Sequence, residues 1–302
     1  MGDLTFALVG PGGEPVDLAR TIDSHGFGGL PPMRQVDGAL EVTLPLPGRR
    51  PRTVRVHAGG RGRGRNTRHA PAPSAATAAA VLDAARHVLR MDQDLSPFYA
   101  LAADDPDLAW VARGSGRMLR SPTVFEDVVK TICTTNCTWS ATTRMVTALV
   151  EHLGEAAPGA PASGPLGRAF PTPAAMAAEG ERFYRDVVRA GYRGAYLRDI
   201  ARRIARDDLD LEALATSQED DDALRERLLA LPGVGPYAAA HILMTLGRHS
   251  RLILDSWTRP TYARIAGKRT VADATIERRF RRYGRWAGLA FWLTCTRDWI
   301  DD

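Results

Sequence analysis

Residues 228–244, Leu-Leu-Ala-Leu-Pro-Gly-Val-Gly-Pro-Tyr-Ala-Ala-Ala-His-Ile-Leu-Met, decide the fold of the chain around them. This stretch predicts a helix that ends at Leu231, a Pro-Gly-Val-Gly turn, and a second helix that begins near Pro236. Gly233 and Gly235 lack a Cβ atom, so the turn can be tight and its backbone can approach another molecule closely. The unpaired N–H groups at the start of the second helix then form a site suited to a phosphate group. An ordinary connector between two helices is the alternative.

One carboxylate follows this hairpin (residues 228–247) at a short distance. Asp255 lies 20 positions after Gly235, at the end of the apolar run Leu252-Ile-Leu. A further helix is expected after Trp257, and a carboxylate beside a helix N-terminus is held in its ionised form. Two interpretations remain open: Asp255 caps that helix, or it is a catalytic carboxylate. One residue is able to do both.

Outward from the hairpin, the chain divides into a β-rich start and a long helical remainder. Residues 39–46 and 52–57 alternate apolar and polar side chains between Gly/Pro turns, which predicts two antiparallel strands. Residues 58–76 are rich in Arg, Gly, Ala and Pro, and we expect a mobile loop there; whether its arginines contact a phosphate backbone stays open. We predict an α+β fold, mostly α, with an antiparallel sheet domain over residues 1–75 and a two-lobed helical body over residues 76–302.

Several threonines mark helix starts in the helical body. Thr123-Val-Phe-Glu126 has the form of a capping box, and Thr172 precedes a proline at a first helical position. We predict helices from residue 123 through Ile132 and over residues 138–153, 173–179, 181–189, 194–206 and 221–230.

The bulk composition is that of an ordinary globular protein, with 44% hydrophobic and 25% charged residues. No apolar run approaches the ~20 residues that a membrane span needs, and the first residues do not form a secretory signal. We therefore expect a cytoplasmic protein, associated with the nucleoid if bacterial. The net charge of +5 rests on arginine, since Lys130 and Lys268 are the only lysines. Either a polyanionic partner or a GC-rich coding sequence accounts for that preference.

The cysteines number three, and this odd count argues against a disulfide framework. Cys133 and Cys137 have no histidine or second cysteine pair nearby, so we expect small buried residues rather than a zinc site.

Four segments, together with the hairpin and Asp255, resemble the helix-hairpin-helix DNA glycosylases. The hairpin and the aspartate are similar to those of the endonuclease III and 3-methyladenine glycosylase superfamily. Residues 191–196, Gly-Tyr-Arg-Gly-Ala-Tyr, and 131–136, Thr-Ile-Cys-Thr-Thr-Asn, resemble stretches of the 8-oxoguanine glycosylases, as does Phe170-Pro-Thr. Residues 16–22 look like the opening strand of the N-terminal sheet domain that those enzymes share with 3-methyladenine glycosylase II.

This resemblance implies roles for particular residues. Asp255 would be catalytic, and the backbone of Gly233, Val234 and Gly235 would hold a DNA phosphate. Asn136 would fill the gap left by an extruded nucleotide, Tyr192 would wedge beside it, and Arg193 would bond to the widowed opposite base. The family also often holds a monovalent cation, here on the carbonyls of Leu229, Leu231 and Val234.

The sequence departs from the bifunctional members at the second residue after Gly235. Those members place a lysine nucleophile there, whereas this chain has Tyr237, which cannot form a Schiff base. 3-Methyladenine glycosylase II also has an aromatic residue at this position, and the resemblance implies that Tyr237 and Trp257 line a base pocket and stack on a cationic purine. Ordinary core packing is the alternative for Tyr237. A four-cysteine iron–sulfur cluster cannot form near Cys295, and the Trp-rich segment around it predicts a core helix.

We therefore expect a monomeric DNA N-glycosylase without lyase activity and without a required cofactor, acting on double-stranded DNA that contains a damaged base. An alkylated purine is the first substrate candidate and an oxidised purine such as 8-oxoguanine the second. A non-catalytic helix-hairpin-helix DNA-binding protein is the alternative of another class.

Overall fold

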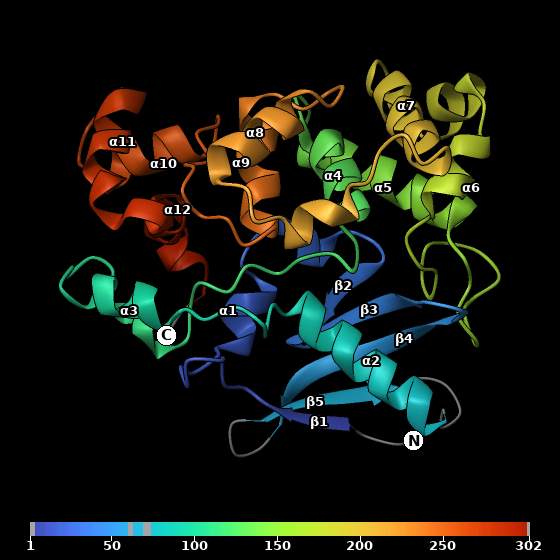
Figure 1. Ribbon diagram of the computed structural model, residues 1–302, viewed down its shortest axis with the longest axis horizontal. Helices are drawn as coiled ribbons and strands as arrows, with labels where there is room; N and C mark the ends of the chain where they lie inside the picture. The colour runs from blue at the N-terminus through green and yellow to red at the C-terminus, as the bar shows by residue number, and fades with distance from the viewer. Residues whose placement is uncertain (1–3, 60–62, 69–73, 301–302) are drawn as a thin grey trace.

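The computed structural model describes residues 4–59, 63–68 and 74–300, and it places a twisted antiparallel sheet beneath a larger helical body (Figure 1). The strands are β1 Leu4–Ala7, β2 Met33–Val36, β3 Ala39–Leu46, β4 Arg49–Gly59 and β5 Arg63–Arg68. The helices are α1 Leu18–Ile22, α2 Ala75–Val88, α3 Ser96–Ala103, α4 Val124–Thr134, α5 Trp139–Leu153, α6 Pro173–Ala178, α7 Arg193–Ala205, α8 Asp221–Leu229, α9 Pro236–Thr245, α10 Thr258–Ile265, α11 Asp273–Phe280 and α12 Ala287–Thr296. Short helical turns are η1 Gly26–Gly29, η2 Ala109–Arg113, η3 Phe183–Val187 (a π-helix), η4 Glu212–Thr216, η5 Arg281–Trp286 and η6 Arg297–Trp299. The predicted class, α+β and mostly α, is confirmed.

The five strands pair in the order β1-β5-β4-β3-β2, and every pairing is antiparallel. The two predicted strands correspond to β3 and β4, in which Val42 lies opposite Val54. Their alternating apolar side chains point to one face, where helix α2 covers them and contributes Val81 and Ala85 to the shared core. The predicted boundary at residue 75 coincides with the start of α2, and the division into two domains stays a prediction.

Two predictions about the first 76 residues are wrong. Residues 16–22 are not a strand, because the Asp17 side chain accepts a hydrogen bond from the Arg20 N–H and starts helix α1. The low-complexity stretch is not a loop throughout, since β4 extends to Gly59 and residues 63–68 form β5 between β4 and β1. Backbone hydrogen bonds to neighbours on both sides stabilise β5 without help from an apolar pattern. Residues 60–62 and 69–73 lie outside the described residues.

The two predicted caps form: the hydroxyl oxygens of Thr123 and Thr172 each accept a backbone N–H at the start of α4 and α6. The hydroxyl of Thr138 caps α5 in the same way, although no cap was predicted there. The capping box at Thr123 is half formed: Glu126 donates its N–H to Thr123, but its carboxylate pairs with Lys130 at 2.6 Å. Both of those side chains are fully buried, and the internal ion pair replaces the reciprocal cap.

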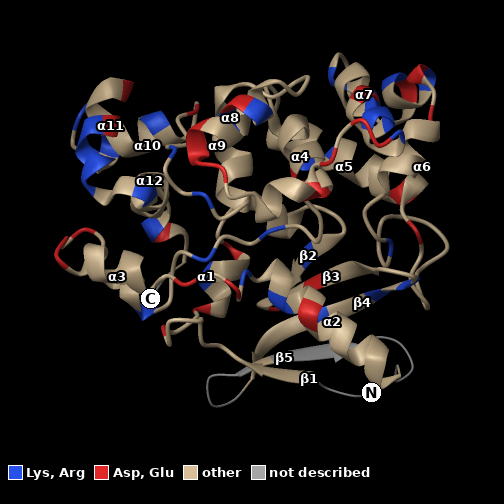
Figure 2. Cartoon of the chain, in the orientation of Figure 1, with Lys and Arg blue, Asp and Glu red and all other residues tan. Residues whose placement is uncertain are grey.

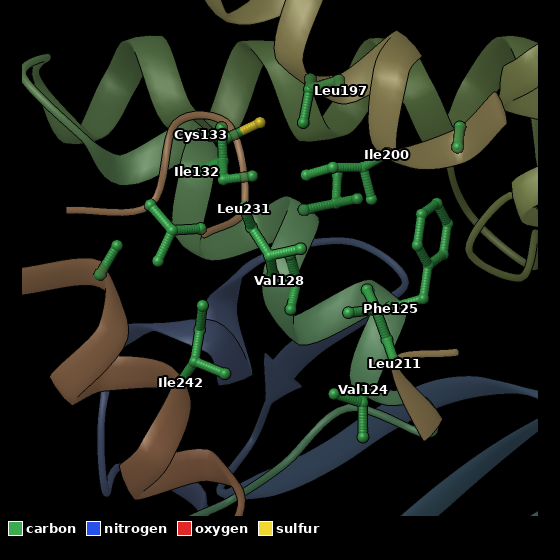
Figure 3. Close-up of a cluster of buried hydrophobic side chains, with 14 of the residues drawn as sticks. Val124, Phe125, Val128, Ile132, Cys133, Leu197, Ile200, Leu211, Leu231 and Ile242 are labelled. Atoms are coloured by element: carbon green, nitrogen blue, oxygen red, sulfur yellow. The ribbon is translucent and has the colours of Figure 1, made fainter. Parts of the chain in front are cut away.

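Two hydrophobic cores give the helical body its two lobes. One core joins α4, α5, α7, α8 and α9, and Figure 3 shows its centre, where Val128 and Ile132 of α4 meet Leu197 and Ile200 of α7. The other core joins α3, α10, α11 and α12. The helix α9 contributes side chains to both cores, so the predicted hairpin stands between the lobes.

Among the described residues, no helix is both long enough and apolar enough to cross a membrane.

Candidate active site

The hairpin forms as predicted, with α8 ending at Leu229 and α9 beginning at Pro236. Gly233 has a φ of +83°, and a Cβ atom there would lie 2.6 Å from Cδ2 of Tyr196, so both its conformation and its surroundings require glycine. Gly235 has an ordinary φ of −95°, and a Cβ atom there would meet nothing within 4 Å. Space beside Gly235 therefore remains open to an approaching molecule.

The first turn of α9 leaves its N–H groups without internal partners. No side chain caps this helix, and Pro236 has no N–H. Within the described residues, the N–H groups of Gly235, Tyr237 and Ala238 donate no hydrogen bond. These groups and the helix dipole make the turn a binding site for an anion such as a phosphate.

Asp255 is held rigidly at the start of α10. Its Oδ1 atom accepts hydrogen bonds from the N–H groups of Trp257 at 2.8 Å and Thr258 at 2.6 Å. Its own N–H donates to the hydroxyl of Thr258, which in turn donates to the carbonyl of Ile253. The second oxygen, Oδ2, accepts no hydrogen bond from any described residue. The carboxylate thus caps α10 with one oxygen and leaves the other uncommitted.

A cavity of about 1180 Å³ opens between the two lobes and gathers most of the predicted residues. Its lining includes the predicted residues Asn136, Tyr192, Gly233, Gly235, Tyr237, Asp255 and Trp257. Val234 is buried and is not part of the lining, and neither is Arg193. Seven of the nine residues predicted for catalysis, base binding and DNA binding therefore converge on one cavity, although four separate segments supply them.

Tyr237 lies where the two hydrophobic cores meet. Its ring packs against both cores, and its hydroxyl lies 3.2 Å from that of Thr134. Burial, and to a smaller degree the charge of Asp255, raise the pKa of Tyr237, so the phenol stays protonated at neutral pH. The residue takes part in core packing and also lines the cavity, so the two sequence interpretations are compatible.

Two histidines and a phenylalanine at the cavity were not predicted from the sequence. The rings of His25, Phe27 and His241 lie 4.9–5.4 Å apart; His25 caps η1, Phe27 lies in η1, and His241 lies in α9. Burial lowers the pKa of His25 to about 4 and that of His241 to about 3, so both imidazoles are neutral at pH 7. His241 follows Tyr237 by four residues, a spacing that places both on one helix face and is the one local signal for its location.

Only one of the two ring nitrogens of His241 has a hydrogen-bond partner among the described residues. Nδ1 lies 3.3 Å from the hydroxyl of Thr131, whereas Nε2 has no hydrogen-bond partner among the described residues. His25 is fully engaged, because Nε2 contacts the Leu119 carbonyl at 2.6 Å and Nδ1 accepts the Phe27 N–H. His241 therefore offers a neutral polar atom to a molecule in the cavity.

Asn136 and Tyr192 meet at the rim of the cavity. The Asn136 amide donates to the Tyr192 hydroxyl at 3.3 Å, and Asn136 has a left-handed φ of +46°, which asparagine tolerates. Tyr192 is 53% exposed. Arg193 is instead buried: it lies against the Tyr192 ring, 4.6 Å from the centroid, and donates to the carbonyl of Thr135. Arg193 thus holds the backbone next to Asn136 through the Thr135 carbonyl, and its predicted contact with a base stays a prediction.

Tryptophans supply much of the remaining wall. Trp257 packs against Trp299 and Trp292, with centroids 5.3 and 5.8 Å away. Trp139 from α5 covers Gly26 so closely that a Cβ atom there would lie 2.5 Å from its ring. The Trp-rich segment is a buried core helix, α12, as predicted, but Trp292 also reaches the cavity. Sequence reasoning identified only Trp257, because the others come from distant segments.

Of the two lysines and three cysteines, only Cys137 lines the cavity. Lys130 is buried against Glu126, Lys268 is exposed beyond α10, and neither lines the cavity. Cys133 is buried as predicted, but Cys137 is exposed and lines the cavity, because α4 ends at Thr134 and the chain turns outward. For Cys137 the prediction of a buried residue is wrong.

The hairpin carbonyls suit the monovalent cation that the resemblance implies. The carbonyls of Leu229 and Val234 accept no hydrogen bond from any described residue, while that of Leu231 accepts the Val234 N–H at 3.2 Å. Carbonyl oxygens at a helix C-terminus carry partial negative charge and attract a cation.

Comparisons with known proteins agree with these observations. No family model matches the chain. A protein of Methanothermobacter thermautotrophicus described as "Probable N-glycosylase/DNA lyase" is 26% identical over 294 residues, which cover 90% of this chain and 89% of that protein.

Solved structures share the fold over nearly the whole chain. MBOgg1 in complex with a low-affinity DNA ligand gives a TM-score of 0.76 at 18% identity and covers 99% of this chain and 97% of its own. The 3-methyladenine DNA glycosylase of Archaeoglobus fulgidus gives 0.75 at 18% identity, covering 99% of both chains. The 8-oxoguanine glycosylase/lyase of Clostridium acetobutylicum gives 0.73 at 20% identity, covering 98% and 96%. The predicted resemblance to the helix-hairpin-helix DNA glycosylases is confirmed, and at these identities the structural likeness shows the fold.

Proposed function

We propose that this chain, which has the fold of the helix-hairpin-helix DNA glycosylases, hydrolyses the N-glycosidic bond of a damaged base that has left the DNA stack. The sequence relative and the fold neighbours support a DNA glycosylase at the level of the family. One observation carries the proposal: Asp255 lines the cavity with one carboxylate oxygen that no described residue engages, beside a hairpin whose N–H groups are open to a phosphate.

DNA binding in this proposal starts at the hairpin. The N–H groups of Gly235 and Tyr237 hold a backbone phosphate, and the open space at Gly235 admits it. A monovalent cation on the Leu229, Leu231 and Val234 carbonyls would add positive charge there. The damaged nucleotide enters the cavity, while Asn136 and the exposed ring of Tyr192 replace its contacts in the stack.

Bond cleavage then develops positive charge on the sugar. As the bond from C1′ to the base nitrogen breaks, its electron pair leaves with the base, and C1′ and the ring oxygen share the resulting charge. Oδ2 of Asp255 stabilises this charge, because its position is fixed in advance by the hydrogen bonds of Oδ1. A water molecule adds to C1′ and gives a proton to the same carboxylate, which completes hydrolysis.

The cavity favours a base that is already positively charged. A neutral base needs a proton in order to leave, but His25 and His241 are unprotonated at pH 7, and the raised pKa of Tyr237 makes it a weak acid. An alkylated, cationic purine leaves without that proton. The rings of Tyr237 and Trp257 stack favourably on such a base. We therefore propose an alkylated purine as the substrate.

An oxidised purine is the second candidate. The arrangement of Asn136, Tyr192 and Arg193 favours it, because these residues match the segments that resemble 8-oxoguanine glycosylases.

We further propose that the enzyme lacks lyase activity. Schiff-base chemistry needs an amine at C1′, yet Tyr237 occupies the hairpin position, Lys130 is locked in an ion pair, and Lys268 lies outside the cavity.

Base release from matched duplexes tests these proposals. Duplexes that carry 7-methylguanine, 8-oxoguanine or no lesion are incubated with the enzyme, then analysed for free base and for strand breaks with and without alkali. We expect release of the alkylated base and strand breaks only after alkali. Faster release of 8-oxoguanine would favour the second candidate, and breaks without alkali together with a borohydride-trapped adduct would refute the absence of lyase activity. Binding without release from a broad lesion panel would indicate a non-catalytic DNA-binding protein.

A further inference from the structure

Positive charge gathers in two segments of the chain, and one of them lies beside the cavity. Residues 259–285 hold nine basic and two acidic side chains, a net charge of +7, whereas the whole chain carries +5. The second segment, residues 49–68, holds eight arginines and no acidic residue, but it belongs to strands β4 and β5 and their connection, and none of its described residues lines the cavity. A general preference for arginine adds charge everywhere and does not account for this segregation.

Only a minority of these nine basic residues are compensated within the protein. Arg259 pairs with Asp273, and Arg279 and Arg282 pair with Asp105. The other six form no ion pair with a described residue, and all six are exposed; we call them the basic surface: Arg264, Lys268, Arg269, Arg278, Arg281 and Arg285. Like charges gathered this closely repel one another, and a polyanion that binds them relieves the repulsion.

The basic surface adjoins the candidate active site. It lies on α10, on the loop that follows α10, on α11 and on η5, where Figure 2 shows basic residues gathered at one end of the helical body. Helix α10 begins three residues after Asp255, and Arg259 in its first turn lines the cavity. The same helix therefore connects the catalytic carboxylate to the uncompensated charge.

We propose that the basic surface of α10, α11 and η5 binds the phosphate backbone of one arm of the duplex, beyond the lesion. The hairpin holds a phosphate near the extruded nucleotide, while this second surface holds phosphates farther along the helix and supports the bend that extrusion requires. The proposal rests on the proposed function only in taking double-stranded DNA as the partner. The guanidinium groups of the basic surface can form paired hydrogen bonds with phosphate oxygens, and such contacts do not depend on the base sequence.

The salt dependence of binding to an undamaged duplex tests this surface. Each phosphate contact contributes about −0.9 to the slope of log Kobs against log salt concentration. Two variants remove three charges each: Arg264→Gln/Lys268→Gln/Arg269→Gln and Arg278→Gln/Arg281→Gln/Arg285→Gln. The matched control removes three exposed arginines elsewhere, from β4, α2 and the residue before η3: Arg50→Gln/Arg86→Gln/Arg182→Gln.

We expect at least one of the two surface variants to reduce the magnitude of the slope by about 2–3, and the control to change it by less than about 0.5. The surface is not a DNA contact if both surface variants keep the wild-type slope, or if the control loses as much as they do, which would indicate a general charge effect. Circular dichroism melts verify folding. Because the duplex is undamaged, the result does not depend on base release; an enzyme that releases no base but shows the expected slopes would refute the proposed function alone.

Discussion

An Asp255→Asn substitution separates the two roles of this residue. Oδ1 of Asp255 accepts the N–H groups of Trp257 and Thr258, and the amide oxygen of asparagine can accept the same two bonds. What the substitution removes is the negative charge facing the cavity. Losing a carboxylate beside a helix N-terminus costs about 0.3–1 kcal/mol of folding stability, so we expect the variant to fold.

The loss of activity should be much larger than the loss of stability. Removing one preorganised electrostatic group costs about 10²–10³ in rate, and loss of the proton acceptor extends the range to about 10⁴. Asp255→Ala should lose at least as much activity and should also lose the cap, at about 0.5–2 kcal/mol. For a chain of this size, that corresponds to a fall in Tm of about 1–4 °C.

Single-turnover base release measures the effect without interference from product release. Excess enzyme is mixed with the best lesion duplex from the panel, and abasic product is quantified after alkali treatment. Binding to abasic DNA serves as the control, because it should survive in Asp255→Asn. If the folded Asp255→Asn variant releases base within tenfold of the wild-type rate, Asp255 is not the catalytic carboxylate. If Asp255→Ala keeps the wild-type Tm, the cap contributes little.

Three further predictions concern the hairpin and the cavity. Gly233→Ala should destabilise the fold by about 1–2 kcal/mol or more, because alanine would have to adopt a positive φ and would contact Tyr196. Gly235→Ala should keep the wild-type Tm and weaken DNA binding, because its Cβ atom would occupy the open space beside the hairpin. Equal melting temperatures for the two variants would contradict this difference. Tyr237→Lys should gain a borohydride-trapped adduct with abasic DNA, since it places an amine in the cavity, and the absence of any adduct would show that the cavity does not bring this position to C1′. Stability should fall as the pH drops from 6.5 towards 4, by up to about 1.4 kcal/mol per pH unit for each histidine that is buried uncharged, because the unfolded chain binds protons that the folded chain excludes. The histidines concerned are His25, with its pKa lowered to about 4, and His241 and His249, with theirs lowered to about 3. Thermal melts at pH 7.5, 6.0 and 5.0 measure it, and an unchanged Tm would contradict it.

Local sequence signals predicted the elements that local chemistry determines. The caps at Thr123 and Thr172 depend on one hydroxyl and a nearby N–H, so a short window of sequence contains all the information. Strand β5 could not be predicted in this way, because its stability comes from pairing with β4 and β1. Asp17 shows the opposite error: the resemblance suggested a strand, although the residue is a good helix cap.

Within the candidate site, too, the residues close together in the sequence were predicted, whereas those brought together by tertiary packing were not. The hairpin and Asp255 lie within one short stretch, and their spacing was visible in the sequence. The pocket around His25 and His241 was not, because more than 200 residues separate the two rings that meet there. Arg193 was assigned to a base contact from resemblance alone, yet its guanidinium lies buried against Tyr192. Local patterns predict what a residue can do, whereas tertiary packing decides which neighbours it has.

Asp255 shows why the two sequence interpretations did not exclude each other. A carboxylate has two oxygens, and here the backbone at the start of α10 engages only Oδ1. These hydrogen bonds fix the position of the carboxylate, which a catalytic carboxylate requires before the substrate arrives. A cap is therefore a means of preparing such a group rather than evidence against one. For an aspartate that follows an apolar run and precedes a helix, the decisive question is what its second oxygen can contact. Asp255 lines the cavity, so a molecule bound there can reach its carboxylate.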